Sequence, residues 1–329
     1  MSIPQLISVV IPTLNEEENI HPFYRVVTEV TSDLQEFEWE FIFVDDGCTD
    51  HTVERLLTLR EKDPRIRILQ LSRNFGSYAA LRAGFDYAHG DAVITISADL
   101  QDPPELFRSF LLRWREGYQI VWGVRTQRED PWSKKVLARL FYRLMSRLAL
   151  SDLPSDGMDY GLFDRKVINA FRQICDRNYV TFMTLYWMGF RQVRVPYTRQ
   201  SRKLGKSKWP LGKLVKSALD VITSFSYLPI RLASYLGLAI SLISIFGASF
   251  ILFNRLVFGI GDLGWPSLMI ALLLLGGVQL IFLGIFGEYL WRISSQVRGQ
   301  PHYLVMNEIG FDATEPMKNE RWESLRDKS

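Results

Sequence analysis

The first third of the chain alternates short apolar, β-branched runs with stretches of helical periodicity, and this alternation constrains the fold more than any other feature. Such runs predict strands, and the stretches between them predict helices. The predicted strands are Leu6–Pro12, Glu40–Asp45, Ile66–Ser72, Ala92–Ser97 and Gln119–Val124. The predicted helices are Glu17–Leu34, Thr52–Glu61, Ser77–Ala88 and Glu105–Glu116. Strands and helices in this order predict an α/β fold with a doubly wound, mostly parallel sheet.

Polar clusters follow four of the predicted strands. They are Thr13–Glu16, Asp45–Gly47, Ser72–Asn74 and Ser97–Asp99. Ordinary turn chemistry accounts for any one cluster. Four in succession favour a site, because ligands of doubly wound sheets bind at the carboxyl ends of the strands.

The stretch after the fourth strand carries the candidate catalytic residues. A carboxylate at the end of a strand, such as that of Asp99, can hold a hard divalent cation that in turn binds a diphosphate. Asp102 precedes Pro103-Pro104, with Glu105 three places on, and this pattern is typical of a helix start with Asp102 as the N-cap. Asp99 and Gln101 are therefore the better candidates for chemistry.

Two long segments, Leu232–Phe253 and Ser267–Gly287, carry no charged residue, although the mean hydropathy of the whole chain is only +0.01. About 20 apolar residues span a bilayer, so both segments are predicted to be transmembrane helices. Two buried core helices are the alternative, but they would need a large surrounding domain, and only a short polar tail follows.

Basic residues flank the predicted spans and set the expected orientation. Six precede the first span and two follow the second, whereas the connection between the spans offers one arginine and one aspartate. The flanking residues are Lys203, Lys206, Lys208, Lys213, Lys216, Arg231, Arg292 and Arg298. Both termini and the catalytic part are thus expected to be cytoplasmic, in a multi-pass protein of the inner (plasma) membrane.

Two amphipathic stretches precede the spans. Residues 134–150 have an apolar face flanked by regularly spaced basic residues, which fits equally a helix on an anionic membrane and one packed on the sheet. Residues 211–222 lead directly into the first span and favour an interfacial position. The expected organisation is a catalytic domain (1–209), an interfacial amphipathic helix (210–230), a transmembrane hairpin (231–292) and a cytoplasmic tail (293–329). A net charge of +3 gives no reason to expect a nucleic-acid partner.

Four motifs in a fixed order resemble the polyprenyl-phosphate glycosyltransferases of glycosyltransferase family 2, and most of all the bactoprenol-phosphate glucosyltransferase type. They are the run from Val9 to Glu17; Asp45-Asp46-Gly47-Cys48-Thr49-Asp50; Arg73-Asn74-Phe75-Gly76; and the stretch from Ala98 to Glu105. The basic run from Arg199 to Lys208 follows them. The resemblance covers nearly the whole chain, extends more distantly to dolichol-phosphate mannose synthases, and implies a sheet of the GT-A type.

The resemblance also implies roles for individual residues. Nucleobase and ribose would be held by Pro12, Asn15, Glu16, Asp45 and Asp46. The metal ligand would be Asp99, holding Mg²⁺ or Mn²⁺, with Gln101 as a nearby substrate contact. Phosphate would be bound by Arg125, Arg199, Arg202 and Lys208. Asp156 and Asp159 would serve the acceptor side, as base or as orienting groups. Two positions depart from the family pattern, which commonly has Asp at Ser97 and Arg at Gly161.

The implied reaction is inverting, metal-dependent transfer of a hexose, with glucose as first choice, from a UDP-sugar to polyprenyl (undecaprenyl) phosphate at the cytoplasmic membrane face. A processive polysaccharide synthase is one alternative, but its Gln-x-x-Arg-Trp motif is missing from the sequence. An inactive membrane-anchored protein that binds nucleotide sugars is the other, suggested by Ser97. Two spans form a thin anchor, so self-association into a homo-oligomer is also expected.

Overall fold

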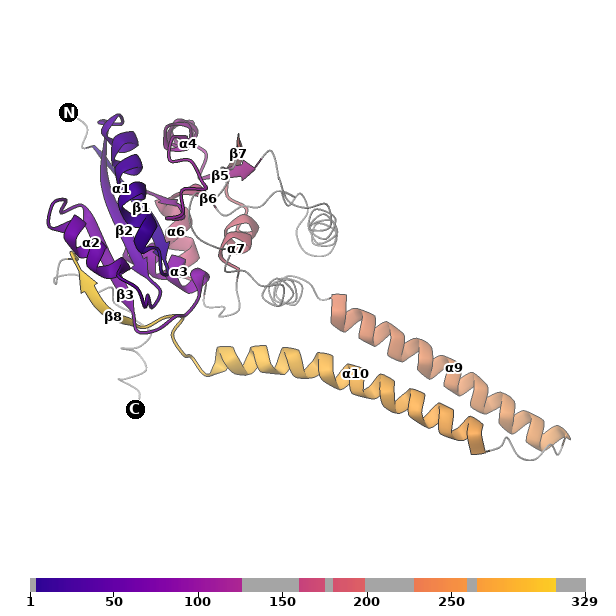
Figure 1. Cartoon of the computed structure of the whole chain (residues 1–329). Coiled ribbons are helices and arrows are strands. Elements are labelled where there is room, and N and C mark those ends of the chain that lie inside the picture. Colours follow the sequence, from indigo (N-terminus) through magenta and orange to yellow (C-terminus); the bar gives the residue numbers. More distant parts are fainter. Residues whose placement is uncertain (1–3, 126–159, 175–179, 199–227, 259–264, 312–329) are drawn as a thin grey trace, which may run out of the picture.

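The computed structural model describes residues 4–125, 160–174, 180–198, 228–258 and 265–311. These residues form an α/β domain and a long helical hairpin that projects from it (Figure 1). The predicted sites and helices within residues 126–159 and 199–227 lie outside the described residues.

The described residues form one mixed sheet with the strand order β7-β5-β6-β4-β1-β2-β3-β8. The strands are β1 (Gln5–Thr13), β2 (Phe37–Asp45), β3 (Ile66–Leu71), β4 (Ala92–Thr95), β5 (Ile120–Arg125), β6 (Tyr160–Asp164), β7 (Gln192–Tyr197) and β8 (Val305–Ile309). Neighbouring strands are parallel except at β6 and β8, which run antiparallel to the strands they pair with. The prediction of a mostly parallel sheet is confirmed.

Helices cover both faces of the sheet. The buried side chains of α1 (Glu17–Ser32), α2 (Thr52–Arg60) and α4 (Leu106–Arg115) belong to one apolar core. Those of α3 (Ser77–Tyr87), α6 (Arg165–Arg172) and α7 (Thr181–Trp187) belong to the second core, on the opposite face. Alternate side chains of β1 point to opposite faces, since Val9 joins the first core and Val10 the second. This is the doubly wound arrangement that the sequence predicts.

All five strands and four helices predicted from the first third of the chain are present, with ends that differ by a few residues. Three further strands, β6, β7 and β8, were not predicted. Two of them, β6 and β8, have five residues each and run antiparallel to their neighbours. They are therefore not part of the strand–helix alternation on which the prediction was based.

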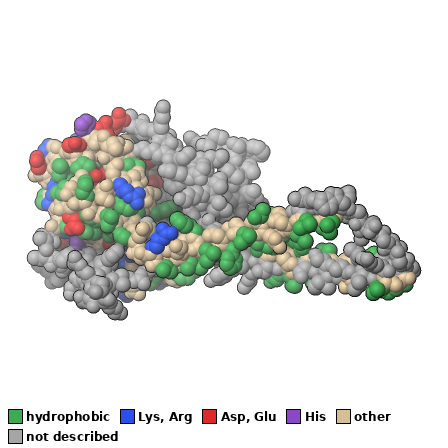
Figure 2. Space-filling model, turned by 90° about the horizontal axis from the view of Figure 1, so that it is seen from below, with side chains coloured by type: hydrophobic (Ala, Val, Ile, Leu, Met, Phe, Trp, Pro, Cys, Tyr) green, Lys and Arg blue, Asp and Glu red, His purple; other side chains and the backbone are tan. Residues whose placement is uncertain are grey.

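The hairpin consists of α9 (Leu228–Phe258) and α10 (Trp265–Val297), which contain both segments predicted to span a membrane. Within the part of the chain that the structure describes, no helix has the length and hydropathy needed to cross a membrane. The prediction of two transmembrane helices is therefore not supported. Hydrophobic side chains nevertheless lie along the surface of the hairpin (Figure 2). Examples are Phe246, which is 76% exposed, and Leu256, which is 77% exposed.

After α10 the chain returns to the α/β domain, where β8 pairs antiparallel with β3 at the edge of the sheet (Figure 1). The backbone N–H of Ser72 donates to the carbonyl of Leu304 at 2.9 Å. The Tyr303 hydroxyl donates to the half-buried carboxylate of Asp86 on α3 at 3.0 Å. The segment expected to be a tail thus contributes an edge strand.

Candidate functional site

The carboxyl ends of the central parallel strands bring the predicted polar clusters to one edge of the sheet. Thr13, the last residue of β1, lies opposite Asp45, the last residue of β2. Asp45 in turn lies opposite Gln70 of β3. On the other side of β1, β4 runs parallel to it, so the turn after β4 reaches the same edge. Ordinary parallel pairing therefore brings these strand ends together at one edge of the sheet.

The turns after β1 and β2 are joined by hydrogen bonds. The Asn15 side-chain oxygen accepts from the backbone N–H of Thr49 at 2.8 Å. The backbone N–H of Glu16 donates to the Thr52 hydroxyl at 2.9 Å. The buried Asp45 carboxylate accepts from the backbone N–H of Cys48 at 2.7 Å. Together with the half-buried Pro12, the residues predicted to hold the nucleoside thus lie on two turns fixed against each other.

Asp46, also predicted to hold the nucleoside, binds the start of α3. Its carboxylate accepts from the backbone N–H of Phe75 at 2.7 Å and from that of Gly76 at 3.0 Å. Burial raises the pKa of Asp46, and these two hydrogen bonds oppose that effect. The described contacts of Asp46 therefore shape the wall of the site, because they hold the turn after β3 in place.

Backbone strain is concentrated at this edge. Among the described residues, Asn15 (φ 52°) and Leu100 (φ 56°) are the non-glycine residues with positive φ. They follow the adjacent strands β1 and β4. For leucine in particular this conformation is unfavourable, and such strain tends to persist at functional sites, where the surrounding structure enforces it. Two strained residues on neighbouring turns support placing the site here.

Asp99 lies directly before the strained Leu100 and is 5% exposed. Its carboxylate accepts from the backbone N–H of Gln101 at 3.2 Å, while Ser97 and Gln101 are half-buried. The described residues contain no group of three or more His, Cys, Asp or Glu side chains that could hold a metal ion. A single carboxylate still fits Mg²⁺ or Mn²⁺, since Mg²⁺ is commonly bound by one or two carboxylates, waters and substrate phosphates.

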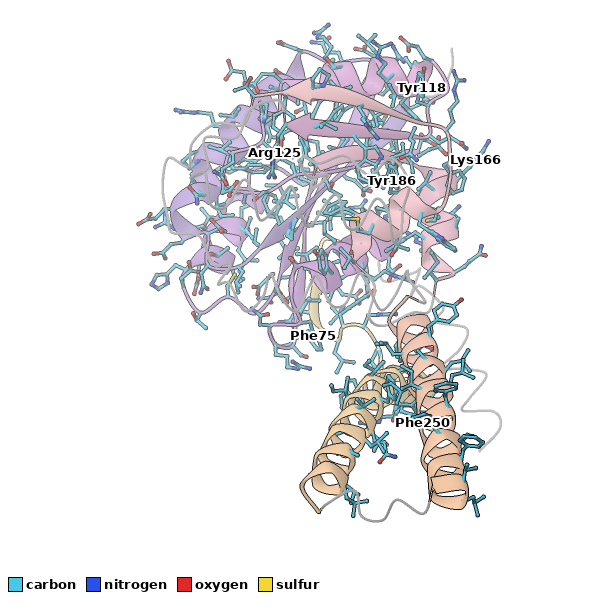
Figure 3. All side chains as sticks on the ribbon, turned by 90° about the vertical axis from the view of Figure 1, so that its right-hand side faces the viewer. Phe75, Tyr118, Arg125, Lys166, Tyr186 and Phe250 are labelled. Atoms are coloured by element: carbon cyan, nitrogen blue, oxygen red, sulfur yellow. The ribbon has the colours of Figure 1, made fainter. Side chains whose placement is uncertain are left out.

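Arg125 ends β5 and is buried at the same end of the sheet (Figure 3). Its Nε donates to the hydroxyl of Tyr197, the last residue of β7, and that hydroxyl donates to the carboxylate of Asp102. The prediction that Asp102 caps the following helix is wrong, because Glu105 occupies the N-cap position of α4. Tyr197 was missed, because a tyrosine ending an edge strand carries no signal in the sequence until the fold brings it to Asp102.

The remaining predicted site residues have different outcomes. Asp156, Asp159, Arg199, Arg202 and Lys208 lie outside the described residues. Gly161 lies in β6, where a Cβ atom would come within 2.6 Å of the Val121 carbonyl oxygen. An arginine at Gly161 would therefore displace β5. The Asp164 carboxylate accepts from the backbone N–H of Lys166 at 2.8 Å and caps α6.

A basic and aromatic pair lies on the turn after β3. The Arg73 guanidinium lies over the Phe75 ring, 4.2 Å from its centroid. Figure 3 shows Phe75 at the end of the α/β domain nearest the hairpin.

The chain is similar in sequence to proteins of known family. Residues 8–172 match the family described as glycosyl transferase family 2. An uncharacterized glycosyltransferase of Synechocystis sp. is 43% identical over 93% of this chain and 96% of its own length. The bactoprenol glucosyl transferase of Shigella phage SfV is 38% identical over 92% of this chain and 98% of its own. Among solved structures, the chain matches glucosyl-3-phosphoglycerate synthase from Mycobacterium tuberculosis in complex with phosphoglyceric acid. The two sequences are 22% identical and the TM-score is 0.48. The match covers 66% of this chain and 78% of that chain.

Proposed function

The chain belongs to glycosyl transferase family 2, and on this basis we propose that it transfers a hexose, with glucose as first choice, from a UDP-sugar to a polyprenyl phosphate. The observation that carries the proposal is the similarity to the bactoprenol glucosyl transferase of Shigella phage SfV over 98% of that protein's length. A match of this extent includes the hairpin as well as the α/β domain. It therefore supports a shared acceptor class in addition to a shared catalytic fold, which is a sheet of the GT-A type.

The donor would bind across the carboxyl edge of the sheet. Carboxylates such as that of Asp45 accept from the imide N–H of uracil and from ribose hydroxyls, and the neighbouring turns of β1 and β2 frame a flat base. The diphosphate would then point toward Asp99 and Arg125. Because Asp45 and Asp46 are already held by backbone amides, little reorganisation would accompany donor binding.

Charge develops on the β-phosphate as the bond from the anomeric carbon to UDP breaks. Asp99 would hold the divalent cation, which when bound supplies positive charge to the diphosphate. The Arg125 guanidinium would add a fixed positive charge at the same edge, where a preorganised group stabilises developing charge without reorganising.

The acceptor is a phosphate monoester whose second pKa lies near ~6, so at neutral pH much of it is dianionic and needs little activation. Its oxygen would attack the anomeric carbon from the face opposite UDP, forming the new glycosidic bond with inversion as UDP leaves. The roles of Asp156 and Asp159 on the acceptor side, and of Arg199, Arg202 and Lys208 on phosphate, remain part of this proposal.

A polyprenyl acceptor keeps its hydrocarbon in lipid while its phosphate enters a polar site. The exposed apolar side chains of α9 and α10 suit contact with lipid, and large exposed apolar surfaces mark interaction sites. We propose that the hairpin brings the α/β domain to a membrane surface, with the catalytic edge on the cytoplasmic side.

The decisive experiment incubates the purified full-length protein in detergent with undecaprenyl phosphate, radiolabelled UDP-glucose and Mg²⁺ or Mn²⁺. We expect label in the organic phase that depends on both the acceptor and the metal, and a product of inverted anomeric configuration by NMR. Parallel reactions with UDP-galactose and UDP-N-acetylglucosamine test the sugar. No lipid-linked label from any UDP-sugar would refute the proposal.

A further inference from the structure

Three buried side chains from three separate elements form a continuous hydrogen-bonded chain beside the Asp99 turn. Arg125 Nε donates to the Tyr197 hydroxyl at 3.3 Å, and the Tyr197 hydroxyl donates to Asp102 Oδ1 at 2.5 Å. The three residues are 8%, 6% and 2% exposed, respectively. They come from the end of β5, the end of β7 and the turn that precedes α4.

The direction of this chain follows from the donors available. A guanidinium only donates and a carboxylate only accepts, so a hydroxyl between them must accept from one and donate to the other. Burial raises the pKa of Tyr197, and the charge of Asp102 raises it further, so the phenol keeps its proton. The buried positive and negative charges at the two ends compensate each other through the tyrosine, and such compensation is what makes buried charges tolerable.

The position of the chain ties it to the site. Asp102 follows Asp99 by three residues, and the strained Leu100 lies between them. The hydrogen bond at Asp102 therefore helps to anchor the far end of this strained turn. At the other end of the chain, the bond from Arg125 Nε fixes the plane of the guanidinium. The Tyr197 hydroxyl thus restrains both the turn that would hold the metal and the Arg125 guanidinium that would face the diphosphate.

We propose that Tyr197 is a positioning residue, which holds Arg125 and the Asp99–Asp102 turn in one fixed arrangement for binding the donor diphosphate. This inference rests on the proposed function, because it takes a nucleoside diphosphate as the ligand. Tyr197 does not contact the substrate in this account; it acts through its two neighbours.

Tyr160 is a natural control. It is fully buried, its ring packs edge-on against that of Tyr197 with centroids 5.8 Å apart, and its hydroxyl donates to the backbone carbonyl of Pro103 at 2.8 Å. Tyr160→Phe therefore removes one buried hydrogen bond to the same turn but leaves the bonds between Arg125, Tyr197 and Asp102 in place. Tyr197→Phe removes both bonds that the Tyr197 hydroxyl makes to these neighbours.

The experiment measures UDP affinity of the full-length protein by calorimetry in the presence of Mn²⁺, for the wild type, Tyr197→Phe, Tyr160→Phe, Arg125→Gln and the double variant Tyr197→Phe/Arg125→Gln. We expect Tyr197→Phe to weaken UDP binding about tenfold, because only part of the free energy of the two lost hydrogen bonds acts on the ligand. We expect Tyr160→Phe to change it less than about twofold. The double variant should bind about as weakly as Arg125→Gln alone, because coupled residues are not additive.

Equal loss of UDP affinity in Tyr197→Phe and Tyr160→Phe, or full additivity in the double variant, would overturn the inference. If Tyr197→Phe does not fold, Asp102→Ala replaces it, since alanine removes the acceptor for the Tyr197 hydroxyl. Unchanged UDP affinity in Asp102→Ala would then count against the inference. UDP binding needs no acceptor lipid, so a wild type that binds UDP but labels no lipid would refute the proposed function and leave this test intact.

Discussion

The buried carboxylate of Asp46 accepts a hydrogen bond from the backbone N–H of Phe75 at 2.7 Å, which ties the turn after β2 to the start of α3. Asp46, which the sequence motifs assign to nucleoside binding, thus also holds the start of α3 in place. The turn after β3, which leads into α3, carries the Arg73–Phe75 pair, so the shape of this wall depends on one carboxylate.

Asp46→Ala should therefore weaken UDP binding and destabilise the fold together. Two backbone amides lose their partner, which costs about 1–3 kcal/mol in the free energy of unfolding. We expect UDP affinity to fall about tenfold, measured by calorimetry. The matched variant is Asp164→Ala, which removes the cap of α6 at the opposite edge of the sheet. A variant at Asp164 that loses UDP affinity equally would show that the effect is not local to the turn.

Gly47 and Gly76 lie on either side of the hydrogen bond between Asp46 and Phe75, and they differ in the space around them. Gly47 and Gly76 both have positive φ, at 78° and 98°. A Cβ atom at Gly47 would lie 2.7 Å from the backbone nitrogen of Asn74, whereas one at Gly76 meets nothing within 4 Å. Gly76→Ala should lower the free energy of unfolding by about 1–3 kcal/mol from backbone strain alone, because φ 98° with ψ 155° is a region open essentially to glycine. Gly47→Ala should cost clearly more, and equal losses in denaturant unfolding would contradict the close packing of the two turns.

Asp99→Asn should lower the rate of sugar transfer by a factor of about 10² or more, because an amide is a poor ligand for a divalent cation and the leaving diphosphate loses stabilisation. Asp91 provides the control. It lies before the start of β4, at the other end of the strand, and accepts from the backbone N–H of Leu6 at 3.0 Å. Asp91→Asn should transfer sugar at close to the wild-type rate. Transfer to lipid and thermal unfolding are measured on the same preparations, so that misfolding is recognised.

Glu40 predicts a pH-dependent contribution to stability. Burial alone would raise the pKa of its carboxyl, but hydrogen bonds from His89 and Ser8 and the charge of Arg67, whose NH1 lies 2.7 Å from Oε2, outweigh burial and lower it. A lowered folded-state pKa contributes stability that is complete above the ordinary value of 4.5 and is lost as the pH falls below it.

We expect Glu40→Gln to lower the free energy of unfolding by about 2 kcal/mol at pH 7. The difference from the wild type should shrink when denaturant unfolding is repeated below pH 4.5. A difference that stays constant over this range would mean that the carboxylate charge contributes nothing.

Short sequence patterns predict the parts of the fold that depend on neighbouring residues in the chain. Alternating apolar runs place the central strands, and strand-end polarity places Asp45, Asp46 and Asp99 at one edge, because parallel strands necessarily end together. The capping rule fails at Asp102, where proline spacing mimics a helix start while the carboxylate binds Tyr197, distant in sequence.

Features that depend on long-range pairing were not predictable in this way. The β8 strand is a short run with no helix periodicity around it, and only the free edge of β3 gives it a partner. Tyr197 has no local signal at all, since its role exists only once β7 lies beside β5. Side chains that join distant segments are therefore the ones that a reading of single motifs misses.

The return of β8 to the sheet has a consequence for how the protein is made. Asn307 on β8 donates to Gln70 on β3 across a sequence separation of 237 residues. Synthesis runs from the N-terminus, so the ribosome makes strands β1 to β7 and the hairpin before β8 exists. Until β8 is made, the edge of β3 has unpaired backbone groups that can pair with strands of other chains. Premature termination within α10 would leave that edge permanently open, and such fragments should aggregate or be degraded even though every residue of the catalytic edge is present.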